Sequence, residues 1–299
     1  MGEPLAGRAA VVTGAGRGIG RAVALALAEL GAAVVVNDVG TGLDGVGTDR
    51  GPAEDVASAI ARGGGRTIAS TVSVTDFAAV EAMIADCVAR FGGIDILVNN
   101  AGTTAAGPLW EMDPATFARV AASHATGTFN CIRCAAPYMR ARGAGRIVNL
   151  VSRAGLVGQA GAAAYAAGKG AVFALTNVAA RDLAPFGVSV NAVSPASTDT
   201  RMVKSAIARA RGEGVAAAER ADKLLASVQA PEDVARVIAA LCLDRAAAIT
   251  GQVFFVEGAR VGLFRPLAVD QEASLDAPTV AAASRVLDGF RLHPLSTPY

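Results

Sequence analysis

The first forty residues constrain the fold most, because a strand, a glycine turn, a helix and a second strand follow one another directly. Residues Ala9–Thr13 are apolar and β-prone, and the glycine-rich run 14–20 separates them from a helical pattern at 21–30. A second buried strand, 33–36, leads to Asp38. This order predicts the first unit of a parallel α/β sheet.

The glycine turn and Asp38 together predict a dinucleotide site. A glycine turn that opens a helix lets backbone N–H groups and the positive helix end meet a pyrophosphate. A carboxylate at the tip of the second strand accepts hydrogen bonds from an adenosine ribose. The alternative is a turn that only packs a helix on a sheet, and the acidic residue favours binding. The residues of this turn expected to bind the cofactor are Gly14, Arg17, Gly18, Ile19 and Gly20.

Asp38 also predicts which nicotinamide dinucleotide is used. A carboxylate at this position hydrogen-bonds the ribose hydroxyls but repels a 2′-phosphate. Arg17 has the opposite effect, since a guanidinium is a good phosphate partner. Asp38 carries more weight because it lies where the hydroxyls must be. We therefore expect NAD, with NADP less favoured.

Strand and helix patterns alternate over about the first 255 residues, although the Gly/Asp-rich connection 40–51 is unusually long. The alternation predicts one α/β, Rossmann-like, doubly wound parallel sheet with helices on both faces. We expect a single domain over 1–259, with an insertion above the sheet at 194–229, and a C-terminal extension at 260–299. The other expected elements are helices 52–62, 76–91, 114–142, 165–185, 231–243 and 279–290, and strands 67–74, 94–98, 147–151, 188–193 and 252–256.

Ser152, Tyr165 and Lys169 are the candidate catalytic residues. Ser152 follows an apolar run at a predicted strand end, and Tyr165 and Lys169 lie four residues apart on one helix face. A nearby ammonium stabilises a phenolate and lowers the pKa of a phenol from its ordinary value near 10. Tyr165 is therefore predicted to exchange protons near neutral pH. The Tyr-x-x-x-Lys spacing alone is common at helix edges, so the other motifs must support it.

Four motifs in sequence order resemble the short-chain dehydrogenase/reductase superfamily over nearly the whole chain: Thr13-Gly14-x-x-x-Gly18-x-Gly20, Asn99-Asn100-Ala101-Gly102, Ser152, and Tyr165-x-x-x-Lys169. The resemblance implies a sheet of seven strands, a nicotinamide cofactor, and a homodimer or homotetramer. It assigns acid–base chemistry to Tyr165, the nicotinamide ribose to Lys169, and orientation of the substrate oxygen to Ser152. The further residues that it implies near the cofactor are Ser73, Val74, Asn100, Ala101, Gly102, Tyr165, Lys169, Pro195, Thr198 and Thr200.

The chain departs from the superfamily pattern at three positions. His124 stands where Asn usually supports a water that links the lysine to solvent, so His124 becomes a candidate in an altered proton relay. Ser73 replaces an Asp that contacts adenine, and Ala196 replaces the Gly after Pro195. The long Gly/Asp loop, His124 and residues 254–262 look most like the (3R)-hydroxyacyl-CoA dehydrogenase domain of peroxisomal multifunctional enzyme type 2 and its bacterial relatives.

The predicted function is an oxidoreductase that moves hydride between a nicotinamide and a secondary alcohol or ketone. A 3-hydroxyacyl thioester, a hydroxysteroid or a polyketide-like molecule would be the substrate. One alternative is a lyase or cyclase of secondary metabolism that uses Tyr165 without net redox. Another is a non-catalytic dinucleotide-binding protein, which the intact Ser152, Tyr165 and Lys169 disfavour.

Charge and cysteine content argue against other classes. The chain has 27 basic and 26 acidic residues and no basic cluster, so we expect neither nucleic acid nor an anionic membrane as a partner. The N-terminus lacks an apolar leader, and no stretch has the length of a membrane span, so a cytoplasmic location is expected. Cys131-x-x-Cys134 lacks a second ligand pair, so we expect no metal.

Overall fold

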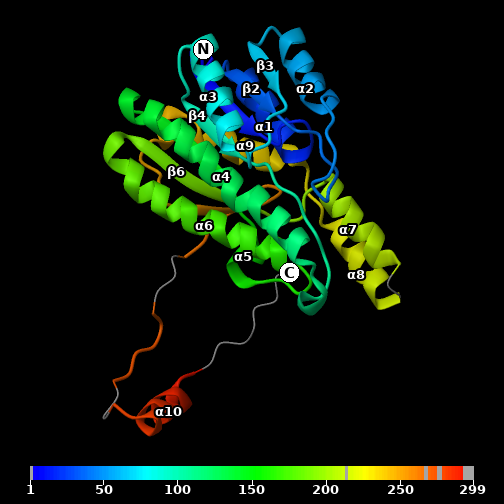
Figure 1. The fold of residues 1–299 in the computed structure, drawn as a ribbon, viewed down its shortest axis with the longest axis vertical. Helices are drawn as coiled ribbons and strands as arrows, with labels where there is room; N and C mark the ends of the chain where they lie inside the picture. Colours follow the sequence, from blue (N-terminus) through cyan, green and yellow to red (C-terminus); the bar gives the residue numbers. More distant parts are fainter. Residues whose placement is uncertain (1–2, 213–214, 266–268, 275–277, 292–299) are drawn as a thin grey trace.

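One sheet forms the centre of the structure (Figure 1), a computed structural model that describes residues 3–212, 215–265, 269–274 and 278–291. Within these residues the strand order is β3-β2-β1-β4-β5-β6-β7-β8, and β1 to β7 run parallel. The order reverses at β1 and β4, which creates a switch point. The strands are β1 (Ala9–Thr13), β2 (Ala33–Asn37), β3 (Thr67–Ser70), β4 (Ile96–Asn99), β5 (Gly145–Leu150), β6 (Val188–Pro195), β7 (Val253–Glu257) and β8 (Arg260–Leu263).

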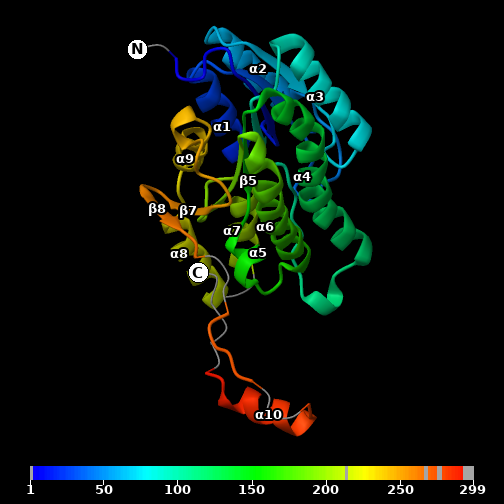
Figure 2. The ribbon, with the colours of Figure 1, turned by 90° about the vertical axis from the view of Figure 1, so that its left-hand side faces the viewer.

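Helices cover both faces of the sheet, as Figure 2 shows edge-on. One hydrophobic core lies beneath α1, α2 and α9, and a second lies beneath α3, α4 and α6. Strands β1 and β2 are buried at every position, as expected for a parallel sheet covered on both sides. The predicted fold class is confirmed. The covering helices are α1 (Gly18–Glu29), α2 (Gly51–Arg62), α3 (Phe77–Phe91), α4 (Pro114–Arg142), α6 (Ala163–Leu183) and α9 (Pro231–Leu241).

The sheet has an eighth strand, so the predicted number of seven strands was wrong by one. Strand β8 pairs antiparallel with β7, with Val256 opposite Val261. The two strands are joined by a tight turn in which Gly258 has φ +57°, a conformation that favours glycine. β8 lies at the sheet edge and no position in it is buried. It therefore lacks the buried apolar pattern from which a parallel strand is recognised in a sequence.

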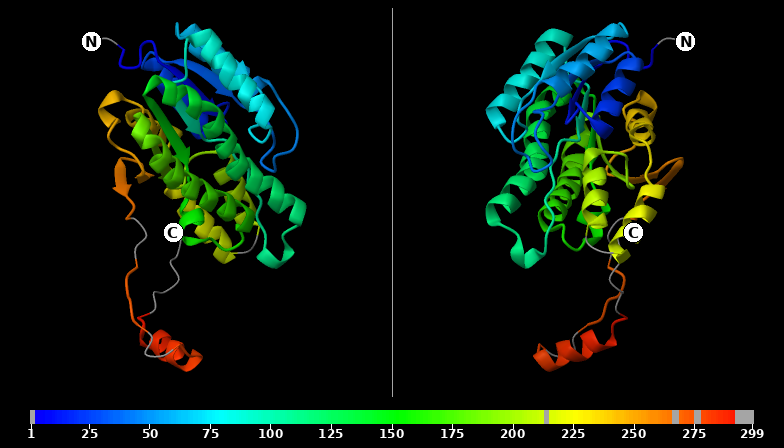
Figure 3. Two further views of the ribbon diagram at one scale, coloured as in Figure 1. Left: turned by 60° about the vertical axis from the view of Figure 1, so that its left-hand side comes forward. Right: turned by 90° about the vertical axis from the view of Figure 1, so that its right-hand side faces the viewer.

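The segment after β6 forms two helices beside the carboxyl ends of the strands (Figure 1). Helix α10 projects away from the layers that cover the sheet, as the two views of Figure 3 also show. No helix in the described residues is long and apolar enough to cross a membrane. These remaining elements are α5 (Arg153–Val157), α7 (Arg201–Arg211), α8 (Val215–Ala226), α10 (Val280–Gly289), and the 3-10 helices η1 (Leu109–Glu111), η2 (Ala184–Phe186) and η3 (Asp244–Ala246).

A buried chain of polar side chains joins β4, β5 and α6. The Asn99 amide nitrogen donates to the Asn149 side-chain oxygen over 2.8 Å, and the Asn149 amide nitrogen donates to Thr176 Oγ1 over 2.9 Å. Thr176 donates in turn to the carbonyl oxygen of Val172 over 2.8 Å. Because buried polar groups are costly without partners, this chain fixes α6 relative to the sheet. Helix α6 carries Tyr165 and Lys169.

Candidate active site

The glycine turn after β1 lies against the loop that follows β4. Gly14 has φ +63°, and a Cβ on it would lie 2.9 Å from the Cα of Ala101. The Asn100 amide nitrogen donates to the carbonyl oxygens of Thr13 and Gly14 over 3.0 and 2.9 Å. A Cβ on Gly20 would lie 2.1 Å from the Gly14 carbonyl oxygen, so α1 also packs closely on the turn. Gly14, Gly20 and Asn100 therefore build the turn itself.

The N-terminus of α1 provides groups that an anion would satisfy. Arg17 is the N-cap residue, its side chain makes no capping hydrogen bond, and the first turn contains no acidic residue. The Arg17 Nη1 atom is buried without a hydrogen-bond partner, while Nη2 lies 3.6 Å from an Asp49 carboxylate oxygen. An uncapped helix N-terminus and a buried guanidinium N–H both fit the pyrophosphate of a dinucleotide. The residues present therefore fit the nicotinamide cofactor that the sequence predicts.

Asp38 occupies the tip of β2 beside this turn. Its carboxylate accepts hydrogen bonds from the backbone N–H groups of Gly16, over 2.8 Å, and Gly40, over 2.7 Å. A Cβ on Gly16 would lie 2.8 Å from the same carboxylate, so the glycine makes this approach possible. These two bonds hold the carboxylate in one orientation at the edge of the cleft.

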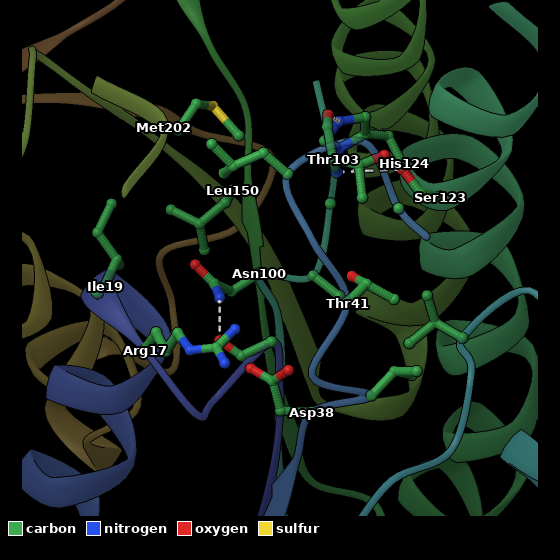
Figure 4. Close-up of a pocket in the computed structure, with 18 of the residues that line it drawn as sticks. Arg17, Ile19, Asp38, Thr41, Asn100, Thr103, Ser123, His124, Leu150 and Met202 are labelled. Atoms are coloured by element: carbon green, nitrogen blue, oxygen red, sulfur yellow. Dashed lines mark hydrogen bonds between the residues drawn. The ribbon is translucent and has the colours of Figure 1, made fainter. Parts of the chain in front are cut away.

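A cleft of about 330 Å³ runs from the glycine turn to Tyr165. Arg17 and Asp38 lie at one end, and Thr103, Ser123 and His124 lie at the other (Figure 4). Most predicted cofactor and catalytic residues line this cleft, namely Gly14, Arg17, Gly18, Ile19, Asp38, Ser73, Val74, Asn100, Ala101, Gly102, His124, Tyr165, Lys169, Pro195 and Thr200.

Gly20, Ser152 and Thr198 are not among the residues that line the cleft. Thr198 is buried, where its hydroxyl donates to the Ala196 carbonyl and accepts from the Gln229 amide. Ser152 caps α5, and its Oγ accepts the N–H of Ala154 over 3.2 Å. The sequence could not distinguish these local hydrogen bonds from contacts to a ligand.

Lys169 is deeply buried, with 5% of its surface exposed. Its Nζ atom donates to the Leu150 carbonyl over 2.5 Å and lies 5.9 Å from the centre of the Tyr165 ring. Burial lowers the pKa of Lys169 to about 7. A negative charge on the neighbouring phenol would favour the ammonium form, so the protonation states of the two residues are coupled.

His124 lies next to Tyr165, with the two rings edge-to-face and their centres 5.2 Å apart. Its Nε2 atom is 2.8 Å from the Thr103 carbonyl oxygen. A carbonyl only accepts, so Nε2 carries the hydrogen and Nδ1 of the neutral ring is an acceptor. Nδ1 is buried without a partner. A Cβ on Gly102 would lie 2.0 Å from His124 Cε1, and one on Gly168 would lie 2.9 Å from His124 Cβ, so both glycines make room for the imidazole.

The His124 ring stays neutral over the physiological range. Burial, followed by the charge of Lys169, lowers the pKa of His124 to about 3, although the hydrogen bond to Thr103 acts in the opposite direction. His124 is therefore a neutral hydrogen-bond donor and acceptor, and not a cation, beside the phenol.

Several residues that line the cleft had no role in the sequence-based prediction. They come from the loop after β2, from α4 and from the start of α7. The unusual length of the Gly/Asp-rich loop was the only signal for the first group. The residues are Val39, Thr41, Gly42, Leu43, Gly45, Arg119 and Ser123, while Arg201 and Met202 were expected only as part of the insertion 194–229.

Comparisons with known proteins find similar sequences and a similar overall structure. The profile of the short chain dehydrogenase family matches residues 8–211. The cis-4-hydroxycyclohexanecarboxylate dehydrogenase of Sinomonas cyclohexanicum is 41% identical over 259 residues, covering 86% of this chain and 98% of that protein. The hydroxyacyl-CoA dehydrogenase ChsB1 of Mycobacterium tuberculosis is 38% identical over 280 residues, covering 91% of this chain and 84% of that protein. A crystal structure of a short chain dehydrogenase from Mycobacterium avium superposes with a TM-score of 0.80 at 33% identity, covering 97% of this chain and 98% of that one.

The low pKa of His124 predicts a specific loss of stability in acid. Between about pH 6.5 and the folded pKa of about 3, the unfolded state binds a proton that the folded ring rejects. The free energy of unfolding therefore falls as the pH is lowered through this window. His124→Asn removes the titrating group, so its unfolding free energy should depend less on pH between 6.5 and 4 in urea titrations. Equal pH dependence in the two proteins would contradict this account.

Proposed function

The chain belongs to the short chain dehydrogenase family and is a hydride-transferring oxidoreductase, and from this premise we propose that it interconverts a secondary alcohol and a ketone, with Tyr165 as acid–base. The observation that carries the proposal is the position of the Tyr165 ring. It lies edge-to-face with the His124 ring and near the Lys169 ammonium, and it lines the same cleft as the glycine turn.

A bound nicotinamide dinucleotide would supply or accept the hydride. In the reducing direction Tyr165 donates its phenolic proton to the carbonyl oxygen, and in the oxidising direction it accepts that proton from the alcohol. Lys169 stabilises the phenolate by its charge. Ser152 would orient the substrate oxygen by donating its hydroxyl hydrogen, since toward the Ala154 N–H its Oγ acts only as an acceptor. Ser152 and Tyr165 therefore act on one oxygen atom, while Lys169 acts through Tyr165.

The dinucleotide would be held by the residues that line the cleft from Gly14 to Lys169. Backbone N–H groups at the start of α1 and the Arg17 guanidinium would bind the pyrophosphate. Asp38 would bind the adenosine ribose, beside Ser73 and Val74. Pro195 and Thr200, from β6 and the N-cap of α7, would border the nicotinamide end together with Lys169.

His124 has a proposed place beside the proton relay. The neutral ring holds the Thr103 carbonyl through Nε2 and leaves Nδ1 as a buried acceptor near Lys169. This arrangement suits a positioning residue that supports proton movement from Lys169 without carrying a charge itself.

The proposed substrate is a hydroxyacyl thioester, with hydroxysteroids and polyketide-like alcohols as the other candidates. Support comes from the relative named hydroxyacyl-CoA dehydrogenase, and the relative named for a hydroxycyclohexanecarboxylate shows that ring alcohols also deserve testing. The resemblance to multifunctional enzyme type 2 stays a prediction. Because the relatives are named as dehydrogenases, net redox chemistry is favoured over the lyase alternative. A cytoplasmic location is also kept as a proposal.

Substitution of Tyr165 tests the acid–base assignment. Tyr165→Phe should lower turnover by at least about a hundredfold, because general acid–base catalysis contributes roughly that much or more. NADH binding, measured by fluorescence titration, should remain near the wild-type value, since only the transferable proton is removed. Lys169→Ala should weaken both turnover and binding. A Tyr165→Phe enzyme with more than about a tenth of the wild-type rate would exclude the assignment.

Cofactor preference rests on the balance between Asp38 and two arginines. Arg17 and Arg201 both line the cleft near this end. Burial, followed by repulsion from Arg17, lowers the pKa of Arg201. The two guanidinium groups would attract a 2′-phosphate, whereas the fixed carboxylate of Asp38 would repel it. We give Asp38 the greater weight because its position is held by two backbone hydrogen bonds. NAD is therefore the proposed cofactor.

The preference is measured as kcat/KM with NADH and NADPH. A repulsion of about 2 kcal/mol would correspond to roughly thirtyfold discrimination in favour of NADH. Asp38→Ser should shift the ratio toward NADPH, because it removes the charge and retains a hydroxyl. Equal or better efficiency of the wild-type enzyme with NADPH would overturn the choice.

The C-terminal extension is proposed to border a substrate pocket or a subunit interface of a homodimer or homotetramer. Leu263, Val280 and Leu287 are exposed, and α10 projects from the rest of the chain. Of the apolar residues that the sequence has in this extension, Leu267 lies outside the described residues, while Phe264 packs on Phe255 with ring centres 6.3 Å apart. Apolar side chains on such an extension favour burial against another surface.

Truncation at Arg265 tests this proposal. The shortened protein should change in mass by light scattering, in KM for substrate, or in both. An unchanged oligomer together with unchanged kinetic constants would remove the extension from the proposed function.

A further inference from the structure

The loop 40–50 between β2 and α2 forms a closed segment, which we call the strap. Its base is held by the bond from Asp49 N–H to the Val39 carbonyl, 3.0 Å long. A Cβ on Gly40 would lie 1.9 Å from the Asp49 carbonyl oxygen, so the two ends of the strap are in contact. Within it, Gly42 N–H donates to the Val46 carbonyl over 2.8 Å. The strap is therefore a compact Ω-type loop with a defined shape.

Three hydrogen bonds tie the strap to elements distant in sequence. The Leu43 carbonyl accepts the N–H of Thr104 over 3.1 Å, in the loop after β4. The Asp44 carbonyl accepts Nε of Arg119, on α4, over 2.9 Å. The Thr41 carbonyl accepts Nη2 of Arg201, on α7, over 3.3 Å. The strap thus reaches from β2 to the opposite wall and to the segment above the strands.

The strap also lines the cleft. Thr41, Gly42, Leu43 and Gly45 face the same space as Asp38. In Figure 4, Thr41 lies between Asp38 and Thr103 along the cleft wall. Asp38 is the proposed partner of the adenosine ribose, so the strap lies at the adenosine end of the proposed dinucleotide site.

Polar contacts hold the strap in this position. Its apolar side chains are Leu43, which is half-buried, and Val46, which is 59% exposed. Moving the strap would therefore expose little apolar surface that is now buried. Water would hydrate the carbonyl oxygens released by Arg119 and Arg201. The cost of moving the strap should therefore depend on its polar contacts, which are the hydrogen bonds of these two arginines, the Thr104–Leu43 bond and the Arg17–Asp49 ion pair.

We propose that the strap is a closure over the adenosine half of the bound dinucleotide, and that Arg119 and Arg201 set the rate at which the dinucleotide leaves. Arg201 begins α7, directly after the N-cap Thr200 that borders the nicotinamide end. The Arg201 side chain therefore connects the strap, at the adenosine end, to α7, which begins beside the nicotinamide end. The inference rests on the proposed dinucleotide site and adds the residues that govern release from it.

The first experiment measures NADH release by stopped-flow fluorescence, with excess NAD as the competitor. Arg119→Ala and Arg201→Ala should each raise the dissociation rate by roughly fivefold to tenfold, since each removes a hydrogen bond from a charged donor. Arg211→Ala is the matched control. Arg211 lies at the other end of α7, pairs with Asp222 and makes no contact with the strap in the described residues. A double variant within twofold of the wild-type rate would overturn the inference.

A second variant tests whether the effect on NADH release comes from the hydrogen bonds to the strap or from the positive charge of the arginines. Replacing residues 41–48 by two glycines removes the strap, and the contact between its ends allows the short connection. This variant should release NADH as fast as the double arginine variant, and adding Arg119→Ala to it should have no further effect. An additional increase of the same size as in the wild-type background would assign the effect to charge and not to closure.

Hydrogen exchange gives a readout that does not depend on turnover. The Thr104 amide, which donates to the strap, should exchange more slowly when NADH is bound to the wild-type protein, and this protection should be lost without the strap. Unchanged exchange on binding would contradict closure. A wild-type protein that binds neither NADH nor NADPH would refute the dinucleotide site itself, whereas normal binding with release unaffected by the variants would refute the strap alone.

Discussion

The hydrogen bonds from the Asn100 amide to the carbonyls of Thr13 and Gly14 are the contact on which the site depends. They join the turn after β1 to the end of β4, at the point where the strand order of the sheet reverses. The backbone that follows Asn100 then makes the other connections. Gly102 leaves room for His124, the Thr103 carbonyl accepts from it, and the Thr104 N–H holds the strap. Residues 100–104 therefore fix the glycine turn, His124 and the strap relative to one another.

The sequence predicted those parts of the fold and site that depend on side-chain type and spacing. β1 and β2 were recognisable because every residue in them is buried, and Tyr165 and Lys169 because helix spacing places them together. β8 was missed because it has no buried face. The ties of the strap were also not predictable, since they use backbone carbonyls of Thr41, Leu43 and Asp44, which any residue could provide.

Burial acts on the two basic groups beside Tyr165 in the same direction but to different effect. It lowers the pKa of Lys169 to about 7 and the pKa of His124 to about 3. The charge of Lys169 lowers the pKa of His124 further, so the two groups are not both positively charged at neutral pH. The lysine is left as the group whose charge responds to the phenol.

His124 fits at its position only because its neighbours are small. The imidazole fills the space that a Cβ on Gly102 would occupy. A Cβ on Gly168 would also lie in close contact with the His124 side chain. Either side chain would force the ring away from Thr103, and the buried Nε2–H would lose its acceptor. An asparagine has two carbons fewer in its polar group and still donates a hydrogen bond. The ring therefore adds edge-on contact with Tyr165 and an acceptor at Nδ1, at the cost of requiring glycine on both sides.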